Sequence, residues 1–489
     1  MRLGFTHSYA DLPERFYTAL PPTPVREPRL AVFNRPLAAE LGLDIDAVER
    51  EAAALFSGNT LPEDARPIAM AYAGHQFGGF VPRLGDGRAI LLGELRCPDG
   101  SLWDLQLKGA GRTPWSRNAD GRAALGPMLR EYLISEAMHA LGIPTTRSLA
   151  VVTTGERVRR DDALPGAILT RIAASHVRVG SFEYFSARGD VEGVRTLLDY
   201  VIGRHYPDAR NAEVPALAVL DAVADRQACL IAQWMQVGFI HGVMNTDNMA
   251  ISGETIDYGP CAFMDAFDPR TVFSSIDHQG RYAYANQPAI AQWNLARLAE
   301  TLLPLIDADP DKAVALALQV IEPFITRFDA HYLAGLRAKL GLATGDDADP
   351  ALVQRLLGLM HAAKADHTLA FRHLADAAEG TGREAPFRAL FPMTQDIEAW
   401  LVDWRDRLAR EPQQPAARAM SMRAVSPAFI PRNHRVEAAL AAASDHGDLG
   451  PFTTLLGILQ RPYDDQPGHT EFMQPPLPSE RVLQTFCGT

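Results

Sequence analysis

The sequence predicts an α+β fold of two lobes, a small β-rich lobe followed by a large helical lobe. Short alternating runs bounded by Gly and Asp-Gly turns fill residues 67–180, whereas helical periodicity dominates from about residue 190. Between the helical runs, His241 and Asn248 keep the spacing of a protein-kinase catalytic loop, and Asp257-Tyr-Gly stands where Asp-Phe-Gly follows in kinases. These observations together predict a protein-kinase-like fold.

Composition limits the classes of partner. The chain has 489 residues, 47% of them hydrophobic, and a net charge of −12. Nucleic acids and membrane surfaces are polyanions, so this charge argues against both as partners. No apolar run reaches the roughly 18 residues of a membrane span, and the N-terminus lacks an apolar signal core. We therefore expect a cytoplasmic protein. A monomer is also expected, although the sequence does not give the oligomeric state.

Changes in residue composition and periodicity along the chain predict four segments. Residues 1–66 are Pro-rich and predicted to be irregular, with short helical pieces such as 36–42 and 46–55, and we expect them to form an extension that wraps a neighbouring domain. Residues 67–180 form the small lobe, and residues 181–430 form the helical lobe with the catalytic and metal loops. Residues 431–489 supply C-terminal helices and an irregular tail.

The small lobe is built from strands and one helix. Residues 88–95 and 102–108 are predicted strands, and a further strand pair covers 147–153 and 166–172. Between the two pairs, an apolar stripe over 125–133 at i, i+3, i+4, i+7 and i+8 predicts a helix, which Gly142 and Pro144 end.

The helical lobe and the C-terminal segment follow from longer periodic runs. The predicted helices are 192–204, 213–238, 289–306, 311–341, 350–378, 395–410, 433–445 and 451–460.

The loop that follows the second long helix carries the metal prediction. Mg²⁺ takes hard oxygen ligands, one or two from side chains and the rest from phosphates and water. Asn248 and Asp257 supply such a pair, joined by a short hairpin over residues 249–256. The general-base position of a kinase, two residues after His241, holds Val243 instead. Taken singly, Asn248 and Asp257 are equally consistent with ordinary turns.

Several cations of the small lobe have spacings that suit phosphate. Lys108 ends a strand and Glu131 lies on the next helix, as in the Lys–Glu ion pair of kinases. Arg171 and Arg178 follow at the end of the lobe, where a triphosphate in an unusual pose would use them. For Lys108 and Glu131 the alternative is a surface Lys and a solvated Glu, and for the two arginines it is a pair of surface salt bridges. Arg160, with its basic neighbours, is predicted to lie on a solvated face.

Two glycine-containing segments complete the predicted nucleotide site. Gly85-Asp-Gly87-Arg88 is a short turn near the position of a kinase glycine loop, although it does not match G-x-G-x-x-G and a plain turn remains the alternative. The long loop after Lys108 contains Asp120-Gly121, and long loops in compact lobes are often functional.

These motifs together resemble the selenoprotein O family, which includes the bacterial YdiU group. The resemblance covers essentially the whole chain and is carried by Tyr72-Ala-Gly-His-Gln-Phe-Gly-Gly, Leu107-Lys-Gly-Ala-Gly-Arg-Thr-Pro-Trp-Ser-Arg, His241-Gly-Val-Met-Asn-Thr-Asp-Asn-Met, Ile256-Asp-Tyr-Gly-Pro-Cys-Ala-Phe-Met-Asp, Arg432-Asn-His and Arg461-Pro-Tyr-Asp-Asp-Gln-Pro.

Membership implies a pseudokinase-like fold that binds ATP inverted and, with Mg²⁺ or Mn²⁺, transfers AMP to Ser, Thr or Tyr hydroxyls of protein substrates. The resemblance implies that Asn248 and Asp257 bind the metal, that Glu131 pairs with Lys108, and that Asp247 accepts the proton, with capping of the loop as its alternative role. The implied nucleotide contacts are Gly85, Gly87, Arg88, Lys108, Asp120, Gly121, Arg171, Arg178 and Asp257.

The family's eukaryotic members carry selenocysteine near the C-terminus, where this chain has Cys487. Because Cys261 follows Asp257-Tyr-Gly-Pro, we hypothesise a reversible, regulatory disulfide between Cys261 and Cys487. An inert pair of thiols is the alternative.

Two other functions are consistent with parts of the sequence. One is a phosphotransferase like the aminoglycoside kinases, whose loop also begins His-Gly but normally keeps an Asp where Val243 stands. The other is a catalytically dead nucleotide-binding scaffold, which the joint presence of Lys108, Glu131, Asn248 and Asp257 disfavours.

Overall fold

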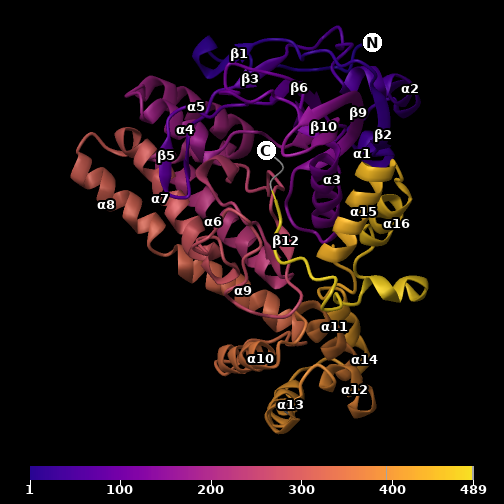
Figure 1. The fold of residues 1–489 in the computed structure, drawn as a ribbon. Helices are drawn as coiled ribbons and strands as arrows, with labels where there is room; N and C mark the ends of the chain where they lie inside the picture. Colours follow the sequence, from indigo (N-terminus) through magenta and orange to yellow (C-terminus); the bar gives the residue numbers. More distant parts are fainter. Residues whose placement is uncertain (393, 487–489) are drawn as a thin grey trace.

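The computed structural model describes residues 1–392 and 394–486 and shows a mixed α/β protein built on one large antiparallel sheet. The sheet and its covering segments form the upper part of the molecule in Figure 1, and most helices lie below and beside it. The strands are β1 (Tyr17–Ala19), β2 (Arg29–Phe33), β3 (Ile68–Met70), β4 (Gly74–Gln76), β5 (Gly79–Val81), β6 (Ala89–Arg96), β7 (Leu102–Lys108), β8 (Ala123–Ala124), β9 (Arg147–Arg159), β10 (Ala163–Ala173), β11 (Phe239–Ile240) and β12 (Ala262–Phe263).

The N-terminal segment takes part in the large sheet. Among the described residues the strand order is β1-β3-β6-β7-β10-β9-β2, with β8 paired to β10. Strands β1 and β2 both come from residues 1–66, so this segment forms both edges of the sheet, and its short strands offer few backbone groups for pairing with other chains. The sequence prediction of an irregular segment missed these two strands because each is short.

Helix α3 (Leu125–Ala140) is buried on nearly all sides. It packs against β9 and β10 on one side and against α15 (Asn433–His446) and α16 (Gly450–Leu459) on the other. Because of this two-sided burial, the helix holds even Arg130, Glu131 and Glu136 in its interior positions.

Helices make up most of the chain after β10. They are α4 (Val179–Ser186), α5 (Val191–His205), α6 (Pro215–Gln236), α7 (Gln287–Ile306), α8 (Pro310–Ile321), α9 (Phe324–Lys339), α10 (Asp349–Ala363), α11 (His367–Ala377), α12 (Ala385–Arg388), α13 (Thr394–Leu408) and α14 (Pro415–Arg423). Two further helices, α1 (Arg35–Glu40) and α2 (Ile45–Phe56), come earlier in the chain, between β2 and β3.

Two of the predicted helices were wrong as single elements. The run 311–341 is divided between α8 and α9 by Pro323, which removes a backbone donor. The run 350–378 is divided between α10 and α11 at Lys364, which adopts the left-handed conformation with φ 52° and ends α10. Helical periodicity continues across both breaks, so the sequence pattern did not reveal them.

The loop between α6 and α7 is fixed by neighbours on several sides. Strands β11 and β12 pair antiparallel, and residues 249–256 bridge to other segments, Ala250 to Arg178 and Thr255 to Thr145. The predicted hairpin over 249–256 was therefore wrong as a self-paired element. Asn433 on α15 binds both the N–H and the carbonyl of Phe263, at 3.2 and 2.8 Å, and so holds β12.

In the part of the chain that the structure describes, no helix is both long enough and apolar enough to span a membrane.

Candidate active site

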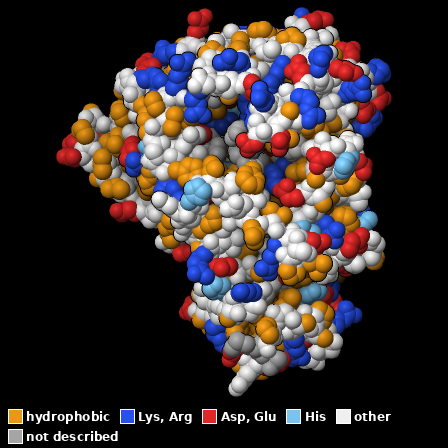
Figure 2. Space-filling view, viewed as in Figure 1, with side chains coloured by type: hydrophobic (Ala, Val, Ile, Leu, Met, Phe, Trp, Pro, Cys, Tyr) orange, Lys and Arg blue, Asp and Glu red, His pale blue; other side chains and the backbone are white. Residues whose placement is uncertain are grey.

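A cavity of about 400 Å³ lies between the large sheet and the loop that carries Asp247, Asn248 and Asp257. This volume is within the range of pockets for small molecules. On the face shown in Figure 2, Lys and Arg side chains gather around a hollow in the upper half of the molecule. The predicted site residues that line the cavity are Gly85, Gly87, Arg88, Lys108, Asp120, Gly121, Glu131, Arg171, Arg178, Asp247, Asn248 and Asp257.

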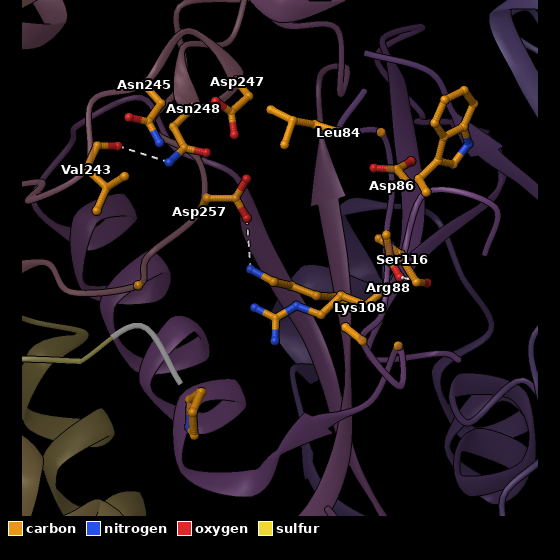
Figure 3. Close-up of a pocket in the computed structure, with 18 of the residues that line it drawn as sticks. Leu84, Asp86, Arg88, Lys108, Ser116, Val243, Asn245, Asp247, Asn248 and Asp257 are labelled. Atoms are coloured by element: carbon orange, nitrogen blue, oxygen red, sulfur yellow. Dashed lines mark hydrogen bonds and ion pairs between the residues drawn. The ribbon is translucent and has the colours of Figure 1, made fainter. Parts of the chain in front are cut away.

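Lys108 lies at the floor of this cavity, at the end of β7. Its Nζ donates to Glu131 Oε2 at 2.5 Å and to Asp257 Oδ1 at 2.8 Å. Glu131 comes from α3 and Asp257 from the loop between β11 and β12, so one ammonium joins three separate elements. Figure 3 shows Asp247, Asn248 and Asp257 on one side of the cavity and Lys108 and Arg88 on the other.

Two arginines join the same carboxylate. Arg171, within β10, contacts Asp257 Oδ1 through Nη1 at 2.7 Å. Arg178, just before α4, contacts Asp257 Oδ2 at 2.8 Å, and the same Nη1 donates to the backbone carbonyl of Asp247 at 2.8 Å. Both guanidinium groups are almost fully buried, so they are not the surface salt bridges that the sequence left as the alternative.

The electrostatics of Asp257 follow from this crowding of cations. Burial disfavours its charge, but Lys108, Arg171 and Arg178 outweigh burial and hold the pKa of Asp257 well below its usual value. Asp257 itself has φ 63°, a left-handed conformation that is uncommon outside glycine. The carboxylate thus stays ionised in an unusual backbone position.

Asp247 lies in a different environment nearby. It is 7% exposed, and burial raises the pKa of its carboxyl to about 6, against the opposing influences of Arg178 and a hydrogen bond from Gln76. The neighbouring Asn248 donates Nδ2 to the carbonyl of Val243 at 2.9 Å. This bond uses the amide NH₂ group and leaves Oδ1 as the atom that can bind a cation.

The predicted glycines are required by close packing. Gly85 has φ 66°, and a Cβ atom there would lie 2.4 Å from the ring of Trp115. Gly121 has φ 72°, and its Cβ would lie 2.2 Å from the backbone of Gly111. A larger residue at either position would displace the loops that form one wall of the cavity.

Asp120 and Arg160 form an ion pair at the cavity wall, with Arg160 Nη1 2.9 Å from Asp120 Oδ2. Arg160 itself lines the cavity. The prediction of a solvated face is confirmed for Arg157 and Arg159, which are exposed, whereas Arg160 is half-buried because the turn between β9 and β10 folds back toward the loop after β7. A basic cluster in the sequence does not show which member turns inward.

Several polar atoms of the cavity wall lack partners. Within residues 1–392 and 394–486, Trp115 Nε1, Arg160 Nε, Arg178 Nε and Asp247 Oδ1 are buried and make no hydrogen bond. Buried polar groups in folded proteins are normally hydrogen-bonded. These four atoms on the cavity wall are therefore available to a polar ligand.

Sequence reasoning missed the role of one segment. Tyr72, Gln76 and Phe77 also line the cavity, and the ring of Tyr72 lies 4.6 Å from the guanidinium carbon of Arg178. The repeated glycines in Tyr72-Ala-Gly-His-Gln-Phe-Gly-Gly were the available signal, since they permit close backbone approach.

The predicted cysteine pair is only partly within the described residues. Cys261 is buried, and Arg130 donates to its carbonyl at 3.2 Å. Cys487 lies outside the described residues, so the disulfide stays a prediction.

The residues present fit a divalent metal ion. Asp257 is an ionised carboxylate and Asn248 offers an amide oxygen, both facing the cavity. A pair of oxygen donors is the number that Mg²⁺ takes from side chains at nucleotide sites. The described residues contain no group of three or more His, Cys, Asp or Glu suited to a metal, so the phosphates of a nucleotide and water would complete the coordination.

Buried cations that face an open cavity beside a carboxylate and an amide are typical of enzymes that act on nucleoside triphosphates. This is the class that the site defines. The family model described as "Protein adenylyltransferase SelO" matches residues 1–460.

Similar proteins agree with this family. The chain is 63% identical to a protein nucleotidyltransferase YdiU of Rhizobium johnstonii over 485 residues, covering 99% of this chain and 97% of the relative. It is 62% identical to the protein of that name in Rhizobium meliloti and 61% identical to the one in Bradyrhizobium sp., with 99% of each chain covered. The chain belongs to the SelO family of protein adenylyltransferases.

Proposed function

We propose that this enzyme transfers AMP from ATP to the hydroxyl groups of Ser, Thr or Tyr side chains in protein substrates. The family supports adenylyl transfer and ATP as the substrate. The observation that carries the proposal at the level of residues is the convergence of Lys108, Arg171 and Arg178 on one side of the cavity. Their charge matches a triphosphate chain.

We also propose a protein-kinase-like arrangement. The Lys108–Glu131 pair between β7 and α3, and the loop from His241 to Asp257, support it. Residues 67–180 then form the small lobe and residues 181–430 the helical lobe. Residues 1–66 and 431–489 are extensions that pack on the small lobe through β1, β2, α15 and α16.

The positions of the cations support an inverted pose of the nucleotide. A kinase places the γ-phosphate beside the acceptor, whereas adenylyl transfer requires the α-phosphate there. In the inverted pose, the γ-phosphate needs a cationic pocket of its own, and Arg171 and Arg178 are buried cations beyond those of a phosphorylating kinase. Gly85, Gly87, Arg88, Asp120 and Gly121 line the remaining wall against the nucleotide.

The chemical step balances with Asp247 as the proton acceptor. The acceptor oxygen forms a bond to the α-phosphorus, the bond from that phosphorus to the bridging oxygen of the β-phosphate breaks, and pyrophosphate leaves. The hydroxyl proton passes to the Asp247 carboxylate, which lines the cavity next to Asn248. Val243, at the base position of a kinase, has no group that accepts a proton.

Asn248 and Asp257 would hold a Mg²⁺ or Mn²⁺ ion, which supplies charge neutralisation on the phosphate oxygens when bound. The cations of the protein act on the same oxygens, and Lys108 remains tied to Glu131 so that its ammonium group stays in place.

One experiment tests the reaction class. Wild type, Asp247→Asn and Asp257→Ala are incubated with a bacterial protein extract and with ATP labelled at either the α- or the γ-phosphate. We expect protein-bound α-label from wild type, a loss of at least about 100-fold in both variants, and no γ-label on protein.

The two alternatives predict other results. Protein-bound γ-label would indicate a phosphotransferase, and nucleotide binding without transfer of either label would indicate a scaffold. Full activity of Asp247→Asn beside an inactive Asp257→Ala would remove Asp247 as the proton acceptor and leave adenylyl transfer standing.

A further inference from the structure

A small hairpin outside the large sheet lies against the catalytic loop. Strands β4 and β5 pair with each other, and the turn between them reaches the segment 245–247. The N–H of His75 donates to Thr246 Oγ1 at 2.7 Å, and the N–H of Phe77 donates to Asn245 Oδ1 at 3.1 Å. Residues 171 positions apart in the chain are thus joined directly beside the cavity.

The hairpin also controls the surroundings of the Asp247 side chain. Gln76 Nε2 donates to Asp247 Oδ2 at 3.2 Å. On the other side of the carboxylate, the backbone of Gly74 is so close that a Cβ atom there would lie 2.7 Å from Oδ1. The carboxylate is therefore held between a backbone wall and one amide donor.

The hairpin is braced from the helical side. Glu183, on α4, accepts hydrogen bonds from His75 Nδ1 and from Thr246 Oγ1, and so ties β4 to the residue before Asp247. Glu183 is 4% exposed. A brace of this kind leaves little freedom for the backbone of Gln76, so its amide has a defined position relative to Asp247.

Neither Gln76 nor the brace belongs to the cation cluster. The hydrogen bonds and ion pairs of Lys108, Arg171 and Arg178 run to Glu131, Asp257, Gln106 and the Asp247 carbonyl. A substitution of Gln76 therefore alters the position of the proton acceptor and leaves the contacts of the three cations in place.

We propose that Gln76 is a positioning residue for adenylyl transfer, which orients the Asp247 carboxylate toward the acceptor hydroxyl. This inference rests on the proposed role of Asp247 as proton acceptor. The hydrogen bond from the Gln76 amide to Oδ2 fixes the rotation of the carboxylate, while Oδ1 faces the backbone of Gly74 and has no hydrogen-bond partner among the described residues. Small errors in the orientation of a general base reduce the rate strongly.

The test removes the donor and keeps the size of the side chain. Gln76→Met is compared with Gln292→Met, because Gln292 is also half-buried but donates to the carbonyl of Ile321 in the helical part. We expect kcat for α-label transfer to fall about tenfold in Gln76→Met, with an unchanged KM for ATP and an unchanged dissociation constant for ATP. Gln292→Met keeps the wild-type kcat.

A double-mutant cycle separates positioning from structure. In the Asp247→Asn background, Gln76→Met should cause no further loss of kcat, because the group that it positions is already gone. Gln76→Leu, which also removes the donor without adding a charge beside Asp247, should resemble Gln76→Met and serves if the Met variant does not fold.

The opposite results overturn the inference. They are an unchanged kcat in Gln76→Met, a full tenfold further loss on top of Asp247→Asn, or a weakened binding of ATP that accounts for the whole effect. Wild-type activity of Asp247→Asn would instead remove the proposed base, and with it the role of Gln76, which distinguishes the two failures.

Discussion

The cavity floor and the helical core below it each bury a lysine, and the two lysines have opposite surroundings. Lys108 is 7% exposed and contacts two carboxylates, Glu131 and Asp257. Lys339, at the end of α9, is 2% exposed, donates to the carbonyl of Val425 at 2.6 Å and lies 5.3 Å from the centre of the Phe371 ring. Within the described residues, no carboxylate pairs with Lys339.

The difference shows what each region is built to hold. Two carboxylates keep the ammonium of Lys108 next to an open cavity, where a polyanionic substrate can replace one of them as a partner. In the helical core, burial alone acts on Lys339 and lowers its pKa to about 7. A buried cation therefore marks the active site only where carboxylates and an open cavity accompany it.

The largest effect is expected at Lys108. Lys108→Met removes the cation that joins Glu131 to Asp257 and that faces the phosphates, so transfer of α-label should fall about 1000-fold. The measurement is the rate of protein labelling at saturating ATP. Lys312→Met is the matched control, because Lys312 is 64% exposed and pairs only with Asp307. A fall of less than tenfold in the transfer rate of Lys108→Met would contradict the contrast between Lys108 and Lys339.

Lys339→Met should leave transfer unchanged and alter the pH dependence of stability. Folding lowers the pKa of Lys339 from its usual value near 10.4 to about 7, so between these pH values the unfolded chain binds one more proton. Stability from this group therefore rises as the pH rises from 7 toward 10. The wild type should gain about 3 kcal/mol relative to the Met variant over that interval.

Urea unfolding of both proteins at pH 6.5, 8 and 9.5 measures this change. His367 on the neighbouring α11 does not interfere, because burial and the charge of Lys339 lower its pKa to about 3. If the free energies of unfolding of the two proteins changed in parallel with pH, Lys339 would stay charged and its surroundings would resemble those of Lys108.

Arg178→Lys sharpens the comparison within the cavity. One nitrogen of Arg178 bridges Asp257 and the Asp247 carbonyl, while Nε lacks a partner, so the guanidinium has donors left for a phosphate. An ammonium group cannot both bridge Asp257 to the Asp247 carbonyl and bind a phosphate. Binding of ATP, measured by calorimetry, should weaken about tenfold. Arg355→Lys, at an exposed pair with Asp403, should bind ATP as the wild type does.

The smallest effect is expected at the rim. Arg160 and Asp120 are 23% and 41% exposed, and ion pairs exposed to this extent contribute little. Arg160→Ala should raise the KM for ATP about threefold and leave kcat unchanged. An effect as large as that of Arg178→Lys would place the triphosphate nearer to the rim than we propose.

Much of the fold could be predicted because its elements are locally encoded. Strands β6 and β7 and helices α3 and α7 follow the expected periodicities almost to their ends. The breaks at Pro323 and Lys364 were missed because apolar periodicity continues through them. Strands β1 and β2 were missed because short edge strands depend on partners distant in the chain.

For the site, the residues that the sequence motifs single out line one cavity. Their chemical roles stay predictions. The contributions of Gln76 and Arg160 could not be predicted, because each depends on a loop that folds back over a long sequence separation. Spacing within a motif says which residues are near each other along a loop, but not which distant side chain completes their surroundings.

The attachment of β12 to α15 has a consequence for the timing of synthesis. The hydrogen bonds from Asn433 to Phe263 and the ion pair of Arg432 with Asp265 hold the segment just after Asp257. A nascent chain that has not yet released residue 433 from the ribosome contains every cavity residue named above but lacks these contacts. Domains generally fold from the N-terminus during translation. The segment just after Asp257 therefore gains these contacts only when α15 has been synthesised, late in translation.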